Sequence, residues 1–163
     1  MATVKDIKRA LYTLIKASQK ELEAQGHKAS GETSNSFEVK VIPGGPVLIG
    51  QVLGSEVLLY LDTGTKPHWV PIAPLKKWAN IVGTGSIRER ESLAYAVQRS
   101  IATVGTPSPG SFRFSSNGRR TNFSEFARKA AQGDVDKILE SSTGEEVEAA
   151  LENIFKTTGL LRA

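Results

Sequence analysis

The chain has 163 residues, of which 39% are hydrophobic and 23% charged, so it is long enough for one domain with a hydrophobic core. It has no cysteine and only two histidines, His27 and His68, which excludes disulfides and argues against a structural metal site. No apolar run reaches the roughly 20 residues of a membrane span, and we expect no membrane partner.

Charge is unevenly distributed along the chain, whose net charge is +4. Residues 59–130 contain 11 Lys and Arg against 4 Asp and Glu, whereas residues 131–163 contain 3 against 7. A basic middle and an acidic tail predict either a nucleic-acid face or complementary surfaces by which copies of the protein meet each other or a neighbour. Solvated faces that simply carry charge are the third interpretation.

The N-terminal residues predict a long amphipathic helix. Thr3 and Asp6 suit its first turn, and Gly26 suits its end. Its apolar residues follow helical spacing at Val4, Ile7, Leu11, Leu14, Ile15 and Leu22.

Three antiparallel strands are expected next. The stretch "FEVKVI" (37–42) alternates apolar and polar residues, and prolines and glycines at residues 43–46 predict a turn. The apolar runs "VLIGQVL" (47–53) and "EVLLYLD" (56–62) are separated by "GS", which is typical of a hairpin.

Residues 64–74 predict a stiff, extended arm, because Gly64 permits a tight exit from the sheet and Pro67 and Pro71 favour extended backbone. Such an arm either contacts a neighbouring subunit or folds back on its own sheet, and the sequence fits both. Pro74 suits the first turn of a short helix over residues 74–82, with Trp78 in the core.

A central helix is expected from a capping-box pattern, Ser86 to Glu89, up to Gly105. Its inward residues are predicted to be Ala94, Val97, Ile101 and Val104.

The stretch "TPSPGSFRFSSNGRRTNF" (106–123) predicts a loop or a protruding hairpin around Asn117 and Gly118. Its part "SFRFSSNGRRTNF" (111–123) is expected to be mobile in the free subunit and ordered on assembly. A short helix is expected from Asn122 to Gly133, and a last helix from Thr143.

The predicted fold class is α+β: a small antiparallel sheet packed by a long N-terminal helix and a second central helix, with an extended arm and a helical C-terminal tail. Residues 1–116 are expected to form the core, and residues 117–163 a loop and helical extension of the same domain.

Motifs of enzyme chemistry are absent from the sequence. No phosphate-binding loop, dinucleotide fingerprint or nucleophile motif occurs. His68 is interpreted as a packing or interface residue, and Asp62 as a turn-forming residue whose carboxylate accepts hydrogen bonds from backbone N–H groups. We therefore expect no enzymatic activity, no catalytic residue and no cofactor.

The stretches "YLDTGTKPHWVPIAPLKKWA" (60–79) and "LAYAVQRSIATVGTPSPGSFRF" (93–114) resemble the small head-tail joining proteins of tailed bacteriophages, the neck or tail-completion family. Those proteins place an acidic-x-Gly-x-x-Pro turn after a strand and then a Pro-Leu-x-x-Trp helix. The resemblance covers residues 58–115, and the chain beyond residue 116 departs from the short family members.

The resemblance implies a structural virion protein that forms a homo-oligomeric ring in the neck between capsid portal and tail, assembled in the host cytoplasm. Its implied partners are copies of itself, a portal, adaptor or other neck protein, a tail tube or terminator protein, and the genomic DNA in the channel. The candidate subunit-interface residues are Lys66, Pro67, His68, Trp69, Phe112, Arg113, Phe114, Arg119 and Arg120. The alternative is a non-enzymatic nucleic-acid-binding module that uses the basic middle region.

Overall fold

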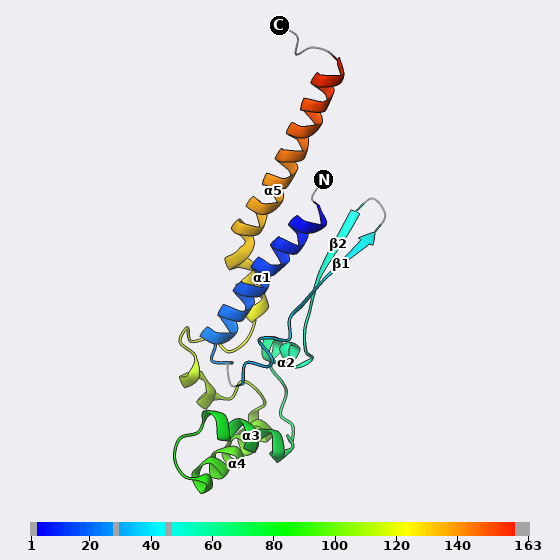
Figure 1. The fold of residues 1–163 in the computed structure, drawn as a ribbon. Helices are drawn as coiled ribbons and strands as arrows, with labels where there is room; N and C mark the ends of the chain where they lie inside the picture. The colour runs from blue at the N-terminus through cyan, green and yellow to red at the C-terminus, as the bar shows by residue number, and fades with distance from the viewer. Residues whose placement is uncertain (1–2, 28–29, 45–46, 159–163) are drawn as a thin grey trace.

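The computed structural model describes residues 3–27, 30–44 and 47–158, and Figure 1 shows that they form an elongated molecule. The expected α+β class with a small antiparallel sheet is confirmed. In chain order the elements are α1 (Val4–Ala24), β1 (Glu38–Gly44), β2 (Val47–Leu53), α2 (Val57–Thr63), α3 (Ile72–Val82), α4 (Ile87–Val104), the 3-10 helix η1 (Pro109–Phe114) and α5 (Phe123–Thr158).

Helix α1 begins as its sequence predicts. The Asp6 backbone N–H donates to the Thr3 hydroxyl over 3.3 Å, and the Thr3 N–H donates to the Asp6 carboxylate over 3.1 Å. These bonds satisfy N–H groups that have no partner within the helix. The buried side chains of α1 are Ala10, Ile15, Ser18 and Leu22.

Strands β1 and β2 form a two-stranded antiparallel hairpin, with Glu38 opposite Leu53 and Gly44 opposite Val47. Two residues of the expected turn, 45 and 46, lie outside the described residues. The third strand that we expected is wrong, because residues 57–63 form α2 instead. In α2, Leu58 is buried and Leu61 packs against the same core, three residues further along one helix face.

The core lies where α1, α2 and α5 meet. Leu22, Leu58 and Phe123 are buried together, and Phe37 and Leu61 pack against them. Helix α1 packs along α5 and also contacts both strands of the hairpin.

The C-terminal helices differ from the prediction. Residues 123–158 form the single helix α5, which neither ends at Gly133 nor starts again at Thr143. A glycine inside a helix costs only about 1 kcal/mol relative to alanine, so the packing of Phe123, Ala127 and Ala131 can outweigh it.

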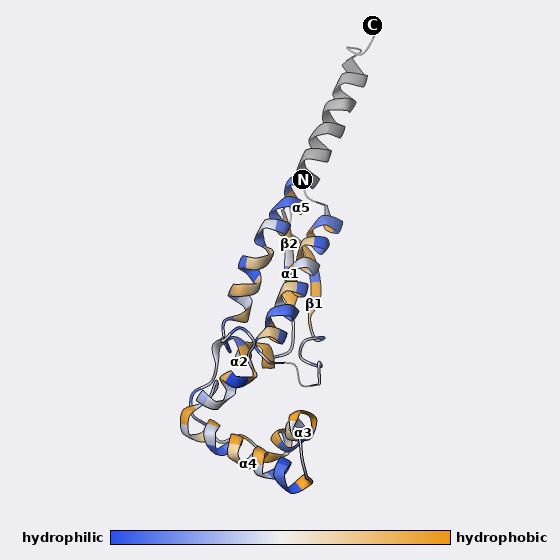
Figure 2. Cartoon of the chain, turned by 90° about the vertical axis from the view of Figure 1, so that its left-hand side faces the viewer, coloured by the Kyte–Doolittle hydropathy of each residue, from blue (hydrophilic) through white to orange (hydrophobic). Residues whose placement is uncertain are grey.

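Helices α3 and α4 form a separate pair at the end of the molecule away from the hairpin (Figures 1 and 2). They pack on each other and on no other described helix or strand, so the expected packing of the central helix on the sheet is not found. Ala79 and Ala94 are fully buried between them. Trp78, expected in the core, is half-buried, and Val104, expected inward, is 48% exposed.

Within the described residues, no helix combines the length and the hydropathy that crossing a membrane requires.

Candidate subunit interface

Two chain segments connect the α3–α4 pair to the rest of the molecule, and they cross at Thr65 and Thr106. The two residues exchange backbone hydrogen bonds of 2.9 and 3.1 Å, and their hydroxyls are 2.9 Å apart. Gly64 and Gly105 flank the crossing with φ of 73° and 80°, and a Cβ on either would lie within 2.4 Å of a backbone oxygen of the other segment. Only glycine fits here, so the crossing fixes where the arm leaves the body.

The arm of residues 64–71 lies against α4 and does not form a strand of the sheet. Beyond Thr65, its backbone is held to α4 by two bonds: the His68 N–H donates to the Ile101 carbonyl over 3.4 Å, and the buried Gln98 amide donates to the Val70 carbonyl over 2.6 Å. The imidazole Nδ1 of His68 lies 2.8 Å from the Lys66 carbonyl oxygen. The arm is therefore extended as predicted, and both of its ends are fixed.

Four consecutive side chains of the arm face solvent. Lys66, Pro67 and His68 are exposed, and Trp69 is 69% exposed. A tryptophan side chain in water leaves a large apolar surface uncovered, and here the backbone that carries it is already ordered. These four predicted interface residues are thus brought together on a single accessible segment.

A second exposed group lies on η1. Phe112 and Phe114 are 43% and 46% exposed, and the Arg113 guanidinium lies 4.8 Å from the centre of the Phe114 ring. Because η1 follows the Thr106 crossing after two residues, it is attached near the base of the arm. Residues 109–114 form a 3-10 helix and residues 115–122 contain no strand, so a protruding hairpin around Asn117 and Gly118 is not found.

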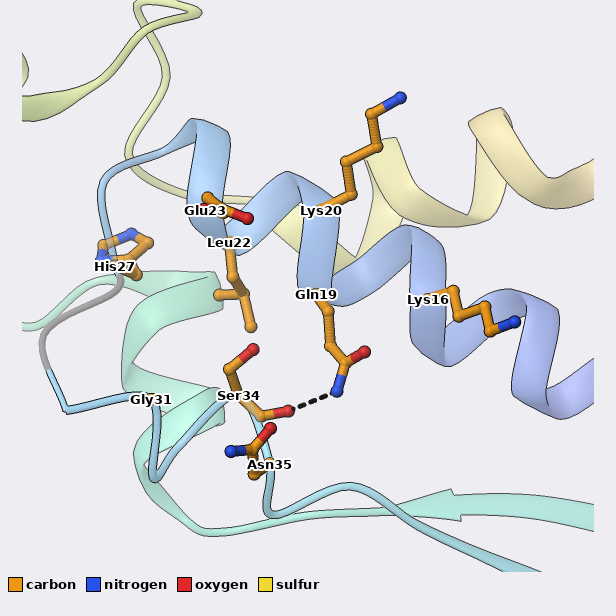
Figure 3. Close-up of a pocket in the computed structure, with 9 residues that line it drawn as sticks. All are labelled: Lys16, Gln19, Lys20, Leu22, Glu23, His27, Gly31, Ser34 and Asn35. Carbon is orange, nitrogen blue, oxygen red and sulfur yellow. Dashed lines mark hydrogen bonds between the residues drawn. The ribbon is translucent and has the colours of Figure 1, made fainter.

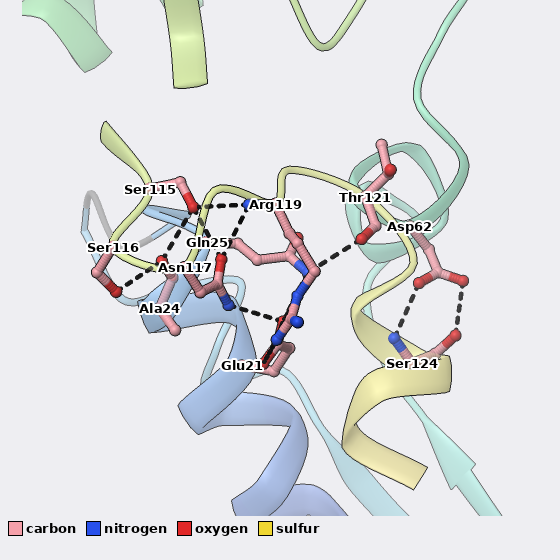
Figure 4. A network of polar contacts seen from close by, with 10 residues as sticks. All are labelled: Glu21, Ala24, Gln25, Asp62, Ser115, Ser116, Asn117, Arg119, Thr121 and Ser124. Atoms are coloured by element: carbon pink, nitrogen blue, oxygen red, sulfur yellow. Dashed lines mark hydrogen bonds and ion pairs between the residues drawn. The ribbon is translucent and has the colours of Figure 1, made fainter. Parts of the chain in front are cut away.

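The remaining two predicted interface residues, Arg119 and Arg120, are bound within their own chain (Figure 4). Arg119 donates from Nε and Nη2 to the Glu21 carboxylate over 3.1 and 3.3 Å, and its guanidinium lies 3.9 Å from the Phe126 ring centre. The Arg120 guanidinium donates to the Gln25 carbonyl. Both cations therefore lie at the C-terminus of α1, where the helix dipole favours positive charge.

The loop that carries these arginines caps α1. The Ser116 N–H donates to the Ala24 carbonyl over 2.8 Å, and the fully buried Gln25 amide donates to the Thr121 carbonyl over 3.0 Å. Asn117 donates to Glu21 over 3.0 Å. We expected this loop to be mobile until assembly; within one subunit it makes these bonds to α1, and its mobility is left to the hydrogen-exchange test below.

Asp62, on α2, joins that helix to the start of α5. Its carboxylate accepts from the Ser124 N–H over 2.9 Å and from the Ser124 hydroxyl over 2.7 Å, and its backbone carbonyl accepts from the Asn122 N–H over 2.8 Å (Figure 4). Asp62 thus caps the N-terminus of α5, where a carboxylate is favourable. The expectation that its carboxylate accepts from a backbone N–H is confirmed at Ser124, 62 residues away, but its expected role as a turn-forming residue is wrong, because Asp62 lies within α2.

Sequence reasoning missed Glu21 and Gln25, the residues of α1 that hold the loop. Each makes contacts over more than 90 residues of chain, so no local pattern marks them. The one available signal was the absence of a basic residue in the last turn of α1, which leaves its C-terminus without a local cation.

A polar cleft of about 380 Å³ lies beside the C-terminal half of α1, between that helix and residues 31–35 (Figure 3). Lys16 and Lys20 stand on its helical side, and the Gln19 amide donates across it to the Ser34 carbonyl over 2.8 Å. His27 closes one end, with its Nε2–H donating to the Arg120 carbonyl over 3.1 Å. Burial, together with the charge of Arg120, lowers the pKa of His27 from 6.5 to about 4.

Acidification is therefore expected to destabilise the subunit. Below pH 6.5 the unfolded chain binds a proton at His27 that the folded chain does not bind until about pH 4, so the free energy of unfolding falls across that window. The loss from this group is at most about 3 kcal/mol. Urea denaturation of the parent and of His27→Gln at a series of pH values checks this, since the variant should have a flatter profile.

His68→Gln is the matched control for that measurement. It removes the other histidine, whose side chain is exposed, and is expected to keep the parent profile. A pH profile that is the same for His27→Gln and for the parent would contradict the assignment.

Searches against protein-family descriptions, curated proteins and solved structures find no match for this chain. Among the described residues, no group of three or more His, Asp or Glu side chains is arranged to hold a metal ion.

Proposed function

We propose that this protein is a structural component of the neck of a tailed bacteriophage, where copies of it form part of a ring that joins the capsid portal complex to the tail. Its partners are then other copies of itself, a portal, adaptor or other neck protein on the head side, a tube or terminator protein on the tail side, and the DNA in the channel. It acts by binding and not by catalysis, and it resides in the virion.

The observation that carries this proposal is the solvent-exposed Trp69 on an arm whose backbone is already ordered. An arm that is fixed before binding loses little conformational freedom when a partner covers it. Large aromatic anchors of this kind supply much of the free energy at protein interfaces. The arm and η1 are also the stretches that resemble the neck family, so the resemblance and the exposed anchors coincide.

The separation of the α3–α4 pair adds support. A helix pair that packs on no other described element leaves its outer sides available to neighbours. Ile81 and Ile87 are 54% and 69% exposed there, and Tyr95 is 51% exposed. Figure 2 shows hydrophobic residues along both helices. A ring subunit needs two such surfaces, one for each neighbour.

The alternative, a nucleic-acid-binding module built on the basic middle region, is less well supported. Its most basic stretch, residues 113–120, contains Arg119 and Arg120, and both are bound within the subunit. Only Arg113 of that stretch is left to meet an external phosphate.

Deletion of the gene from the phage or prophage that encodes it tests the proposal. We expect filled heads and separate tails by electron microscopy, and we expect the purified protein to restore joining when it is mixed with them. Normal tailed particles from the deletion strain would refute the neck role.

A further inference from the structure

Helix α1 carries a row of positive charge that the interface described above does not use. Lys5, Arg9, Lys16 and Lys20 recur at spacings of four or seven residues, and Lys8 lies three residues after Lys5, which places all five along one side of the helix. All five are exposed, and Tyr12 lies among them with 55% of its surface exposed. We call these five cations the α1 basic stripe.

The stripe is held on a rigid support. The opposite side of α1 carries its buried residues and packs against α5 and the hairpin. The helix therefore cannot turn its basic side inward, and the stripe faces solvent over about 22 Å of helix between Lys5 and Lys20, at 1.5 Å per residue.

No cation of the stripe forms an ion pair of 4.0 Å or less with another described residue. The ion pairs of 4.0 Å or less among described residues join Lys76 to Glu91, Arg119 to Glu21 and Lys129 to Glu125, none of which belongs to the stripe. Glu23 is the acidic residue that follows the stripe on the same side of the helix, at its C-terminal end. Five like charges along one line repel each other, so an external polyanion that lies along them is stabilised.

We propose that the α1 basic stripe binds the phosphate backbone of duplex DNA. This deepens the proposed function, on which it rests for its biological setting, by naming the side of the subunit that faces the channel. Four of the five cations are lysines, a residue depleted at protein interfaces, whereas lysine and arginine supply most contacts to phosphates. An acidic protein surface is therefore the less favoured occupant.

The side chains of the stripe also predict the kind of binding. Lysine, which makes up four of the five cations, is a point charge on a flexible stem and suits phosphate oxygens more than the paired donors and acceptors of base edges. Contacts to phosphates alone hold DNA through charge and carry no sequence information. Binding should thus be independent of base sequence and should weaken steeply with salt.

Fluorescence anisotropy with labelled duplexes of about 30 base pairs tests this between about 50 and 200 mM salt. If most of the stripe is engaged, log affinity should fall with log salt with a slope of about −3 to −4, since each neutralised phosphate contributes about −0.9. Two duplexes of unrelated sequence should give the same affinity. The double variant Lys16→Gln and Lys20→Gln should reduce the slope by about 2.

The matched control is the double variant Lys77→Gln and Arg88→Gln, which removes the same charge from exposed positions on α3 and α4. It should keep the parent slope. An equal loss in both variants, no binding at the lowest salt, or equally tight binding of poly-glutamate would each overturn the assignment. Because the assay uses the isolated subunit, its failure is distinct from failure of the neck role, which the deletion strain reports.

Discussion

Replacing Trp69 with alanine is expected to abolish joining of heads and tails while the subunit keeps its thermal stability. The side chain is 69% exposed, so little packing is lost in the monomer. The bonds that hold the arm, from His68 to Ile101 and from Gln98 to Val70, involve no atom of the Trp69 side chain. Truncation of a buried aromatic anchor costs on the order of 2 kcal/mol or more per interface, and a ring repeats that loss in every subunit.

Trp78→Ala is the matched control for this experiment. Trp78 is half-buried on α3, in a helix pair with few fully buried side chains, so its loss should lower the free energy of unfolding by about 2 to 4 kcal/mol. Thermal melts of the two variants and the joining assay with purified protein separate the two roles. A fall in melting temperature that is equal for both variants would mean that Trp69 is part of the fold and not of an interface.

Local signals in this sequence predicted local structure well. Thr3 with Asp6 and Ser86 with Glu89 each form both hydrogen bonds of a capping box, because such a motif depends on residues only three positions apart. The positive φ of Gly64 and the first turn of α3 around Pro74 also follow from the conformational limits of single residues, although Gly64 ends helix α2 and not a strand of the sheet.

The run "VLLYLD" shows where periodicity fails. A short, continuous apolar run fits a buried strand and a buried helix equally well. Here Leu58 and Leu61 complete a core with Leu22 and Phe123, which are distant in sequence, and that packing requires the two leucines on one helix face. Helix α5 shows the same failure of local signals. Its packing on α1 stabilises a helix that continues past Gly133, where the sequence alone predicts an end.

The basic residues show a different limit. Composition identified residues 59–130 as the basic region. Within it, however, Arg119 donates to the Glu21 carboxylate and Arg120 donates to the Gln25 carbonyl, so both side chains are bound inside the subunit. Residues 1–58 are nearly neutral in sum, with 7 basic against 6 acidic residues, but folding sorts Lys5, Arg9, Lys16 and Lys20 onto one exposed side. Net charge by segment therefore predicts a charged surface less well than helical spacing does.

Gly26→Ala is expected to be among the most damaging single substitutions in the chain, with a loss of roughly 3 kcal/mol or more in the free energy of unfolding. Gly26 has φ of 74°, and a Cβ there would lie 2.1 Å from the Phe114 carbonyl oxygen. An alanine must therefore push the loop of residues 115–122 away from the C-terminus of α1.

The Gly26→Ala change combines two costs, the strain of a left-handed backbone and the clash of the new Cβ, and Gly118→Ala has only the first. Gly118 has φ of 72°, but nothing lies within 4 Å of a Cβ built there, so only the left-handed backbone penalty of about 1 kcal/mol applies. Urea denaturation of the parent and of each variant gives the loss in the free energy of unfolding that each substitution causes. Hydrogen exchange at Ser116, whose N–H donates to the Ala24 carbonyl, should show protection in the parent and in Gly118→Ala and fast exchange in Gly26→Ala. Fast exchange of that amide in the isolated parent would mean that the loop orders only on assembly, and Arg119 and Arg120 would then again be candidates for a partner surface.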